Sequence, residues 1–208
     1  MAQQPITFKY DGKEVKFRNI GESYLSHFRK GQFYENALLE HIRALDLEGI
    51  YLDIGCNRGN HLVFFAMFTP ATKVIGFEPL PHYAEKIIDV IQDNLLGDIA
   101  EVVEIAVADF TGPLNLSFMN KTYDVEACKI DDFNLTDVSV MKIDIEGMEI
   151  PAIKGARDTI ERCSPRIYAE ALTKKDFSAI EALLAEQGYR FTGHVFNASP
   201  TYEFKRET

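Results

Sequence analysis

The chain has 208 residues, of which 46% are hydrophobic, and its 22 Lys and Arg against 32 Asp and Glu give a formal net charge of −10. Length and composition predict one globular domain, and no internal repeat or long linker divides it. The acidic charge excludes nucleic acid and anionic membranes as expected partners, because both repel it and no basic patch is visible. The 3 Cys, an odd number, together with a start unlike a signal peptide and no membrane-length apolar run, predict a cytoplasmic protein.

Residues 1–48 are predicted to form a small extension ahead of a main domain at 49–208. Two strand-like runs, 6–10 and 14–17, flank Asp11-Gly12, a dipeptide typical of a hairpin turn. A helix is expected near residues 34–45. We expect this extension to lie over the edge or the mouth of the sheet formed by the rest of the chain.

From residue 50 onward, short β-branched runs alternate with stretches of helical period, which is the pattern of βαβ units. The expected strands are 50–54, 73–77, 102–107, 138–143 and 166–170, with helices at 60–68, 81–91 and 150–162. About thirty residues without a crossover helix precede the fourth of these strands, and 114–118 are expected to form an extra strand there.

The last part of the chain changes character. A helix over 177–187 is closed by Gly188, and residues 189–192 and 201–205 then predict a hairpin. The sequence therefore predicts an α/β fold with a doubly wound, mostly parallel sheet whose last strand is antiparallel.

The turn after the first expected strand contains Gly55, Cys56, Asn57 and Gly59 and leads into a helix at Asn60. Glycines at 55 and 59 allow the backbone to turn sharply and to approach a ligand. Turns that bind a pyrophosphate normally carry G-x-G-x-x-G, whereas here the acid Asp53 ends the strand and the glycines are spaced differently. The turn thus favours a cationic ligand, although similar turns also occur in proteins without a cofactor.

The second expected strand ends at Glu78 and Pro79. A carboxylate at this place can accept hydrogen bonds from both hydroxyls of a ribose. An adenosyl ligand without a pyrophosphate agrees with both the glycine turn and the carboxylate at 78, and S-adenosylmethionine is the leading candidate. The alternative is that Glu78 serves only as an acid at the start of a helix.

The fourth expected strand is followed by Asp144, Glu146 and Glu149. These carboxylates could activate a hydroxyl, stabilise a sulfonium, or hold a divalent cation through Asp144 and Glu146. The alternative for the two glutamates is a place in the first turn of the helix that Pro151 marks. His61, near the start of the helix after the glycine turn, is expected to face the ligand, to cap that helix or to lie at the surface.

Several segments resemble the FkbM family of S-adenosylmethionine-dependent methyltransferases. The most specific is Lys142-Ile-Asp-Ile-Glu-Gly-x-Glu149, and the similarity runs from about Phe33 to Glu170. Tyr34-Glu35 is similar to a tyrosine–glutamate pair that this family often has ahead of the sheet. Cys56 stands where family members usually have alanine, and since both residues are small the turn is expected to keep its form.

The resemblance implies a class I, Rossmann-like methyltransferase fold and O-methylation of a sugar, a glycan or a related small molecule by in-line displacement. The residues expected to bind the cofactor are Glu35, Asp53, Gly55, Cys56, Asn57, Gly59, Asn60, Glu78, Pro79, Ala106, Val107 and Asp144. The expected catalytic residues are Asp144, Glu146, Glu149 and His61. The alternatives are a nicotinamide-dependent oxidoreductase and a non-catalytic binding module on the same fold.

Overall fold

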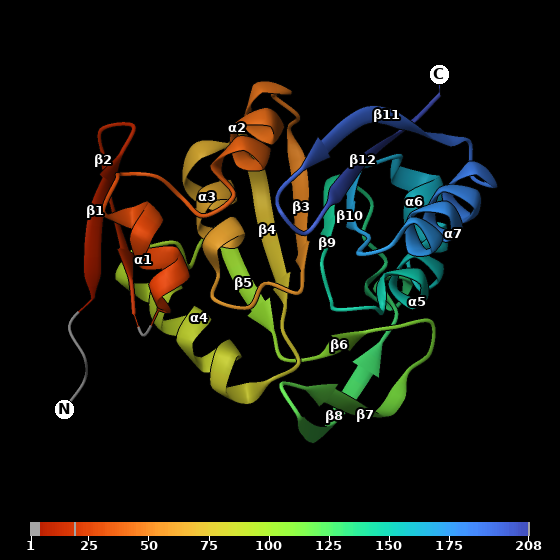
Figure 1. Ribbon diagram of the computed structural model, residues 1–208, viewed down its shortest axis with the longest axis horizontal. Coiled ribbons are helices and arrows are strands. Elements are labelled where there is room, and N and C mark those ends of the chain that lie inside the picture. Colours follow the sequence, from red (N-terminus) through yellow and green to blue (C-terminus); the bar gives the residue numbers. More distant parts are fainter. Residues whose placement is uncertain (1–4, 19, 208) are drawn as a thin grey trace.

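The computed structural model describes residues 5–18 and 20–207, and within them the main sheet has seven strands in the order β11-β12-β10-β9-β3-β4-β5 (Figure 1). The strands are β3 (Gly49–Ile54), β4 (Ala71–Phe77), β5 (Ala100–Val103), β9 (Val138–Ile143), β10 (Arg166–Glu170), β11 (Tyr189–Phe196) and β12 (Thr201–Arg206). Strands β5, β4, β3, β9 and β10 run parallel, and β12 is antiparallel to both β10 and β11. The predicted mostly parallel sheet with an antiparallel last strand is confirmed.

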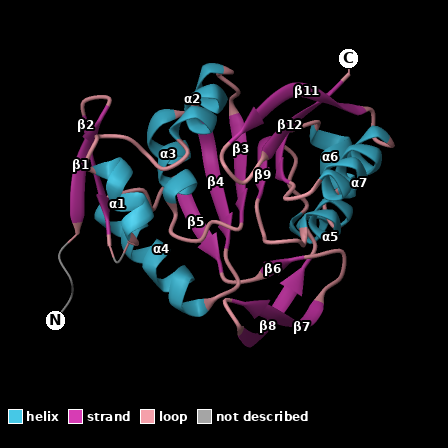
Figure 2. Ribbon diagram, in the orientation of Figure 1, coloured by secondary structure: helices cyan, strands magenta, loops and turns pink. Residues whose placement is uncertain are grey.

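Helices cover both faces of this sheet (Figure 2). One layer holds α1 (Glu22–Phe28), α2 (Asn36–Ala44), α3 (Asn60–Phe68) and α4 (Pro81–Asp93), and the other holds α5 (Glu149–Lys154), α6 (Arg157–Cys163) and α7 (Lys174–Ala185). Successive residues of a strand point to opposite faces, so Tyr51 belongs to the first core cluster and Leu52 to the second. The sheet is therefore doubly wound, as predicted.

The N-terminal extension packs on the first helical layer. Its predicted hairpin is present as β1 (Ile6–Tyr10) and β2 (Lys13–Phe17). The Phe33 ring lies edge-on to the Phe64 ring of α3 at a centroid distance of 5.1 Å, and Arg18 donates to Asp93 Oδ1 of α4 at 2.6 Å. Because α3 is enclosed between the sheet and this extension, nearly all of its residues are buried, which explains why its sequence is apolar on every side.

Two expected elements are each divided in the structure. The run 102–107 is split, because after β5 the chain turns away and β6 (Ala106–Val107) joins a separate sheet with β8 (Lys121–Cys128) and β7 (Gly112–Phe118). We call this three-stranded sheet the arm, and β7 is the extra strand that the sequence predicts. The expected helix 150–162 is two helices, interrupted at Gly155, where a Cβ atom would lie 1.9 Å from the Ala108 carbonyl oxygen.

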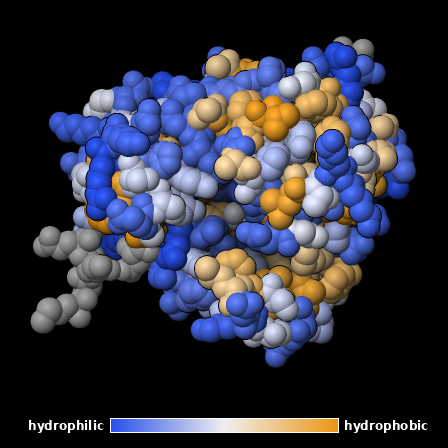
Figure 3. Space-filling view, viewed as in Figure 1, coloured by the Kyte–Doolittle hydropathy of each residue, from blue (hydrophilic) through white to orange (hydrophobic). Residues whose placement is uncertain are grey.

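Hydrophobic side chains gather over the arm and over the region of α2 and β11 on the face drawn in Figure 3. Met119 in the arm and Val195 in β11 are 76% and 49% exposed. Across residues 5–18 and 20–207, none of the helices combines the length and the apolar character that a bilayer crossing demands.

Candidate active site

A pocket opens beyond the carboxyl ends of β3, β4 and β9, where open α/β sheets bind their ligands. It encloses about 1010 Å³, including the open space at its mouth. The extension forms one wall and the arm another. The residues that line it include Tyr24, Tyr34, Glu35, Gly55, Cys56, Asn57, Asn60, His61, Glu78, Pro79, Leu80, Tyr83, Ala106, Val107, Phe118, Lys142, Asp144, Glu146 and Met148.

Gly55 brings the turn after β3 against the loop after β9. Its φ is +84°, and a Cβ atom there would lie 1.9 Å from the Asp144 carbonyl oxygen. The Asp144 N–H donates to the Ile54 carbonyl at 3.0 Å and ties the two loops together. Gly59 (φ +75°) stands at the N-cap of α3 and is outside the pocket lining. The first glycine thus serves close contact between two loops, and the second serves the start of a helix.

Glu78 is held rigidly at the end of β4. Its side chain accepts hydrogen bonds from the Asn57 N–H (2.9 Å) and the Leu80 N–H (3.0 Å), one on each oxygen. Burial raises the pKa of the Glu78 carboxyl to about 7, against the opposing effect of those two hydrogen bonds. Each oxygen has a second lone pair, so the carboxylate can still accept two ligand hydroxyls.

Asp53 is fully buried and does not line the pocket. The Lys142 Nζ lies 3.5 Å from Asp53 Oδ1 and 3.2 Å from Asp144 Oδ2. Asp53 and Lys142 are paired positions on neighbouring parallel strands, which places their side chains on the same face. Lys142 lines the pocket and Asp53 does not, so the expected contact of Asp53 with the cofactor stays a prediction. Neither Asp53 oxygen has a hydrogen bond.

Asp144 lines the pocket at the end of β9. Glu170, at the end of the neighbouring strand β10, interacts with it and was not among the expected residues. Burial raises the pKa of the Asp144 carboxyl, but the charge of Lys142 and hydrogen bonds from Lys142 and Glu170 outweigh it and lower the pKa. For Glu170, burial and then the Asp144 charge raise the pKa to about 8. Their surroundings therefore favour an ionised Asp144 beside a protonated Glu170. The signal in the sequence is that Glu170 ends the strand next to that of Asp144.

The extension contributes a histidine contact. Glu35 Oε2 lies 3.0 Å from His61 Nε2, an ion-pair distance without the alignment of a hydrogen bond, and both side chains are nearly buried. The Asn60 side chain accepts from the Tyr34 N–H at 3.2 Å and donates to the Tyr34 carbonyl at 2.9 Å. This clamp fixes Glu35, whose backbone is left-handed at φ +58°. Sequence position alone does not reveal that Tyr24 joins the same wall.

The two expected catalytic glutamates are used differently. Glu146 is exposed and lines the pocket. Glu149 lies outside the lining, and its Oε1 accepts the N–H groups of Ile145 and Gly147 at 3.1 Å each, so it shapes the loop. Among the described residues, Asp144 and Glu146 belong to no group of three potential ligands close enough to hold a metal. With no third ligand group beside them in the described part of the chain, Asp144 and Glu146 do not fit a cation site.

Comparisons with known proteins agree with this fold. A family model described as a methyltransferase FkbM domain matches residues 53–191, about two thirds of the chain. A solved structure of methyltransferase FkbM from Methylobacillus flagellatus KT is similar with a TM-score of 0.62 and 20% identity, covering 76% of this chain and 44% of that one. The chain therefore spans less than half the length of that structure. No curated relative matches the chain.

Two further solved structures share the fold at lower identity. The precorrin-6y C5,15-methyltransferase from Geobacter metallireducens GS-15 has a TM-score of 0.53 and 17% identity, over 81% of this chain and 84% of that one. The M. jannaschii TYW2 structure, a complex with AdoMet, has a TM-score of 0.51 and 10% identity, over 99% and 88%. At such identities the likeness shows the fold alone.

Proposed function

The chain belongs to the FkbM methyltransferase family, and on that premise we propose that it transfers a methyl group from S-adenosylmethionine to a hydroxyl of a sugar, a glycan or a related small molecule. The observation that carries the proposal is the position of the Glu78 carboxylate. This buried carboxylate is held by two backbone N–H groups at the end of β4 and lines a pocket whose glycine turn lacks the pyrophosphate fingerprint. A nicotinamide-dependent oxidoreductase would need that fingerprint.

The lining fits each part of an S-adenosylmethionine molecule. Glu78 offers acceptors for the ribose hydroxyls, and the small apolar residues Ala106 and Val107 of β6 offer a surface for the adenine. Asp144 and Glu35 place negative charge where a sulfonium and an ammonium need it. When bound, the cofactor would supply an electrophilic methyl group. The neutral product would lose the attraction of the carboxylates to the sulfonium, which favours its release.

We propose Asp144 as the base that receives the proton of the acceptor hydroxyl. Lys142 fixes the Asp144 side chain through a contact of 3.2 Å and keeps it ionised. A base contributes about 10²- to 10⁴-fold in rate, and positioning of the two reactants can contribute roughly 7 to 11 kcal/mol. His61, close to Glu35, is the second candidate base in the same pocket. The chain's own groups thus provide orientation, charge and a proton acceptor.

The acceptor side of the pocket is aromatic and acidic. The rings of Tyr24 and Tyr34 lie with their centroids 4.8 Å apart at the wall that the extension forms. Tyrosine faces pack well against the C–H face of a sugar, and the nearby carboxylates accept hydroxyl hydrogen bonds and repel anions. This wall supports a neutral, hydroxyl-rich acceptor.

The test is calorimetric titration with S-adenosylhomocysteine and, in parallel, with NAD. The variants are Glu78→Gln and the control Glu186→Gln, which changes an exposed glutamate outside this pocket. At pH 8, above the Glu78 pKa of about 7, the loss of hydrogen bonds to a charged acceptor should weaken binding of the homocysteine compound roughly 10- to 100-fold in Glu78→Gln and leave the control unchanged.

Binding of NAD in place of S-adenosylhomocysteine would overturn the proposal in favour of an oxidoreductase. Methyl transfer from S-adenosylmethionine to a panel of sugars and glycans is measured by mass spectrometry. Binding of S-adenosylhomocysteine without transfer to any member of the panel would favour a non-catalytic module.

A further inference from the structure

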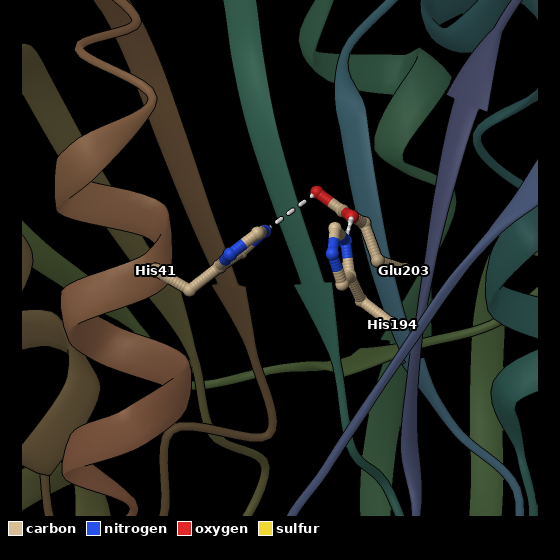
Figure 4. Close-up of side chains that lie close together, drawn as sticks. All are labelled: His41, His194 and Glu203. Carbon is tan, nitrogen blue, oxygen red and sulfur yellow. Dashed lines mark hydrogen bonds and ion pairs between the residues drawn. The ribbon is translucent and has the colours of Figure 1, made fainter.

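Two histidines and a buried glutamate meet on the face of the sheet that α2 covers (Figure 4). His41 comes from α2, His194 from β11 and Glu203 from β12. Their potential ligand atoms all lie within 4.8 Å of one another. None of the three lines the pocket described above, so the cluster is a separate feature of the molecule.

The distances suit a shared ion. His41 Nε2 lies 3.0 Å from Glu203 Oε1, and His194 Nδ1 lies 2.7 Å from Glu203 Oε2. Neighbouring ligands of a tetrahedral zinc ion, at bond lengths of about 2.0 to 2.2 Å, are roughly 3.3 Å apart. The ion would require a small movement of the rings. The His194 side chain can make it, because 57% of its surface is exposed.

The glutamate is held in place by groups that are not ligands. Arg166 and Tyr168 each donate to Glu203 Oε1 at 2.9 Å, and Thr192 donates to Oε2 at 2.6 Å. Burial raises the pKa of the Glu203 carboxyl, but in the metal-free structure hydrogen bonds from Thr192, His41, His194 and Tyr168 outweigh it and lower the pKa to about 2. Outer hydrogen bonds of this kind orient the ligating carboxylates of metal sites.

We propose that His41, His194 and Glu203 bind a divalent transition-metal ion of the zinc type. Two histidines and one carboxylate, with water in an open fourth position, are a ligand set that zinc uses. Each neutral histidine would carry its N–H on the other ring nitrogen, so that the lone pairs of His41 Nε2 and His194 Nδ1 face the ion. The charge of Arg166 beside the same carboxylate sets an affinity below that of a site without a neighbouring cation.

The ion would cross-link parts of the chain that are far apart in sequence. It would tie α2 to the β11–β12 hairpin, and α2 begins at Asn36, directly after the pocket residue Glu35. Metal binding would therefore stabilise the helix that continues from the acceptor wall. The inference concerns binding and stability, and it stands apart from methyl transfer.

The test uses the tag-free chain, stripped with a chelator and titrated with zinc. Bound zinc is measured by elemental mass spectrometry after dialysis, and the melting temperature is followed in parallel. The variants are His194→Gln and His41→Gln, and the matched control is His82→Gln, an exposed histidine that packs beside Tyr83. We expect one zinc per chain and a higher melting temperature, with affinity at least about tenfold lower in either ligand variant and unchanged in the control.

Cobalt provides an independent readout, since Co²⁺ in a tetrahedral site gives visible absorption that should disappear in His194→Gln. The proposal fails if equimolar zinc does not remain bound, or if both ligand variants bind it as well as the control does. The melting temperature of each metal-free variant shows that it is folded. The affinity for S-adenosylhomocysteine is measured on the same samples. It tests the proposed function independently of zinc binding.

Discussion

The pocket region and the Glu203 cluster both contain buried carboxylates, but these carboxylates differ in how many hydrogen-bond partners they have. In the cluster, Glu203 has five side-chain partners on its two oxygens, contributed by Arg166, Tyr168, Thr192, His41 and His194. Below the pocket, both Asp53 oxygens are buried without a hydrogen bond. Unsatisfied buried charge is costly, whereas a saturated carboxylate holds elements together. The difference separates a carboxylate that five neighbouring side chains satisfy from one whose charge is balanced by Lys142.

The largest effect should come from removing the cation beneath the pocket. Lys142→Met leaves Asp53 and Asp144 without their shared counter-ion, and breaking a buried pair in this way costs about 3 to 5 kcal/mol. Chemical denaturation measures the loss. The double variant Lys142→Met/Asp53→Asn should recover part of it, and equal stability of single and double variants would contradict this account of the lysine.

A second variant tests the close contact between the two pocket loops, which follow β3 and β9. Gly55→Ala places a Cβ atom against the Asp144 carbonyl at a positive φ, and we expect a loss of about 3 kcal/mol or more and loss of cofactor binding. Gly12→Ala is the matched control, since Gly12 has φ +77° with nothing within 4 Å, and strain alone costs about 1 to 2 kcal/mol.

Amide hydrogen exchange shows which region responds to Gly55→Ala. Protection should fall around β3 and β9 and persist in β12. An equal loss of amide protection in β3, β9 and β12 would contradict the expectation that the pocket region responds separately from the Glu203 cluster.

The fold was predictable from the sequence because periodicity is a local property. The strand-end positions of Gly55, Glu78 and Asp144 follow from the same reading, and the structure brings these residues into one pocket. The features that could not be predicted from the sequence depend on contacts between distant segments. Register across β3 and β9 sets Lys142 beside Asp53, and the approach of the arm at Ala108 divides the helix at Gly155.

The titration of Glu78 sharpens the contrast on the pocket side. Its pKa is about 7 in the folded protein against an ordinary value of 4.5, so between these values the folded chain holds a proton that the unfolded chain has released. Stability should therefore fall by about 2 to 3 kcal/mol as the pH rises from about 4.5 to about 7, and stay level above that. Denaturation of wild type and Glu78→Gln across this range isolates the effect, and parallel curves for the two proteins would refute it.

The smallest effect belongs to the saturated region. Tyr168→Phe removes one of the donors to Glu203 and leaves the others, so we expect a loss of only about 1 kcal/mol. A loss as large as that of Lys142→Met would mean that the partners of Glu203 depend on one another, and a double variant with Thr192→Val would measure their coupling.

The clamp between Asn60 and Tyr34 has a consequence for engineering. The family model begins at residue 53, whereas Tyr24, Tyr34 and Glu35 reach the pocket from the extension that precedes it. In the proposed function the tyrosines of the extension would contact the acceptor, and the Asn60 side chain links that extension to the start of α3 through Tyr34. A chimaera that exchanges the first 48 residues but keeps Tyr34, Glu35 and Asn60 should change the acceptor preference while leaving the affinity for the cofactor intact.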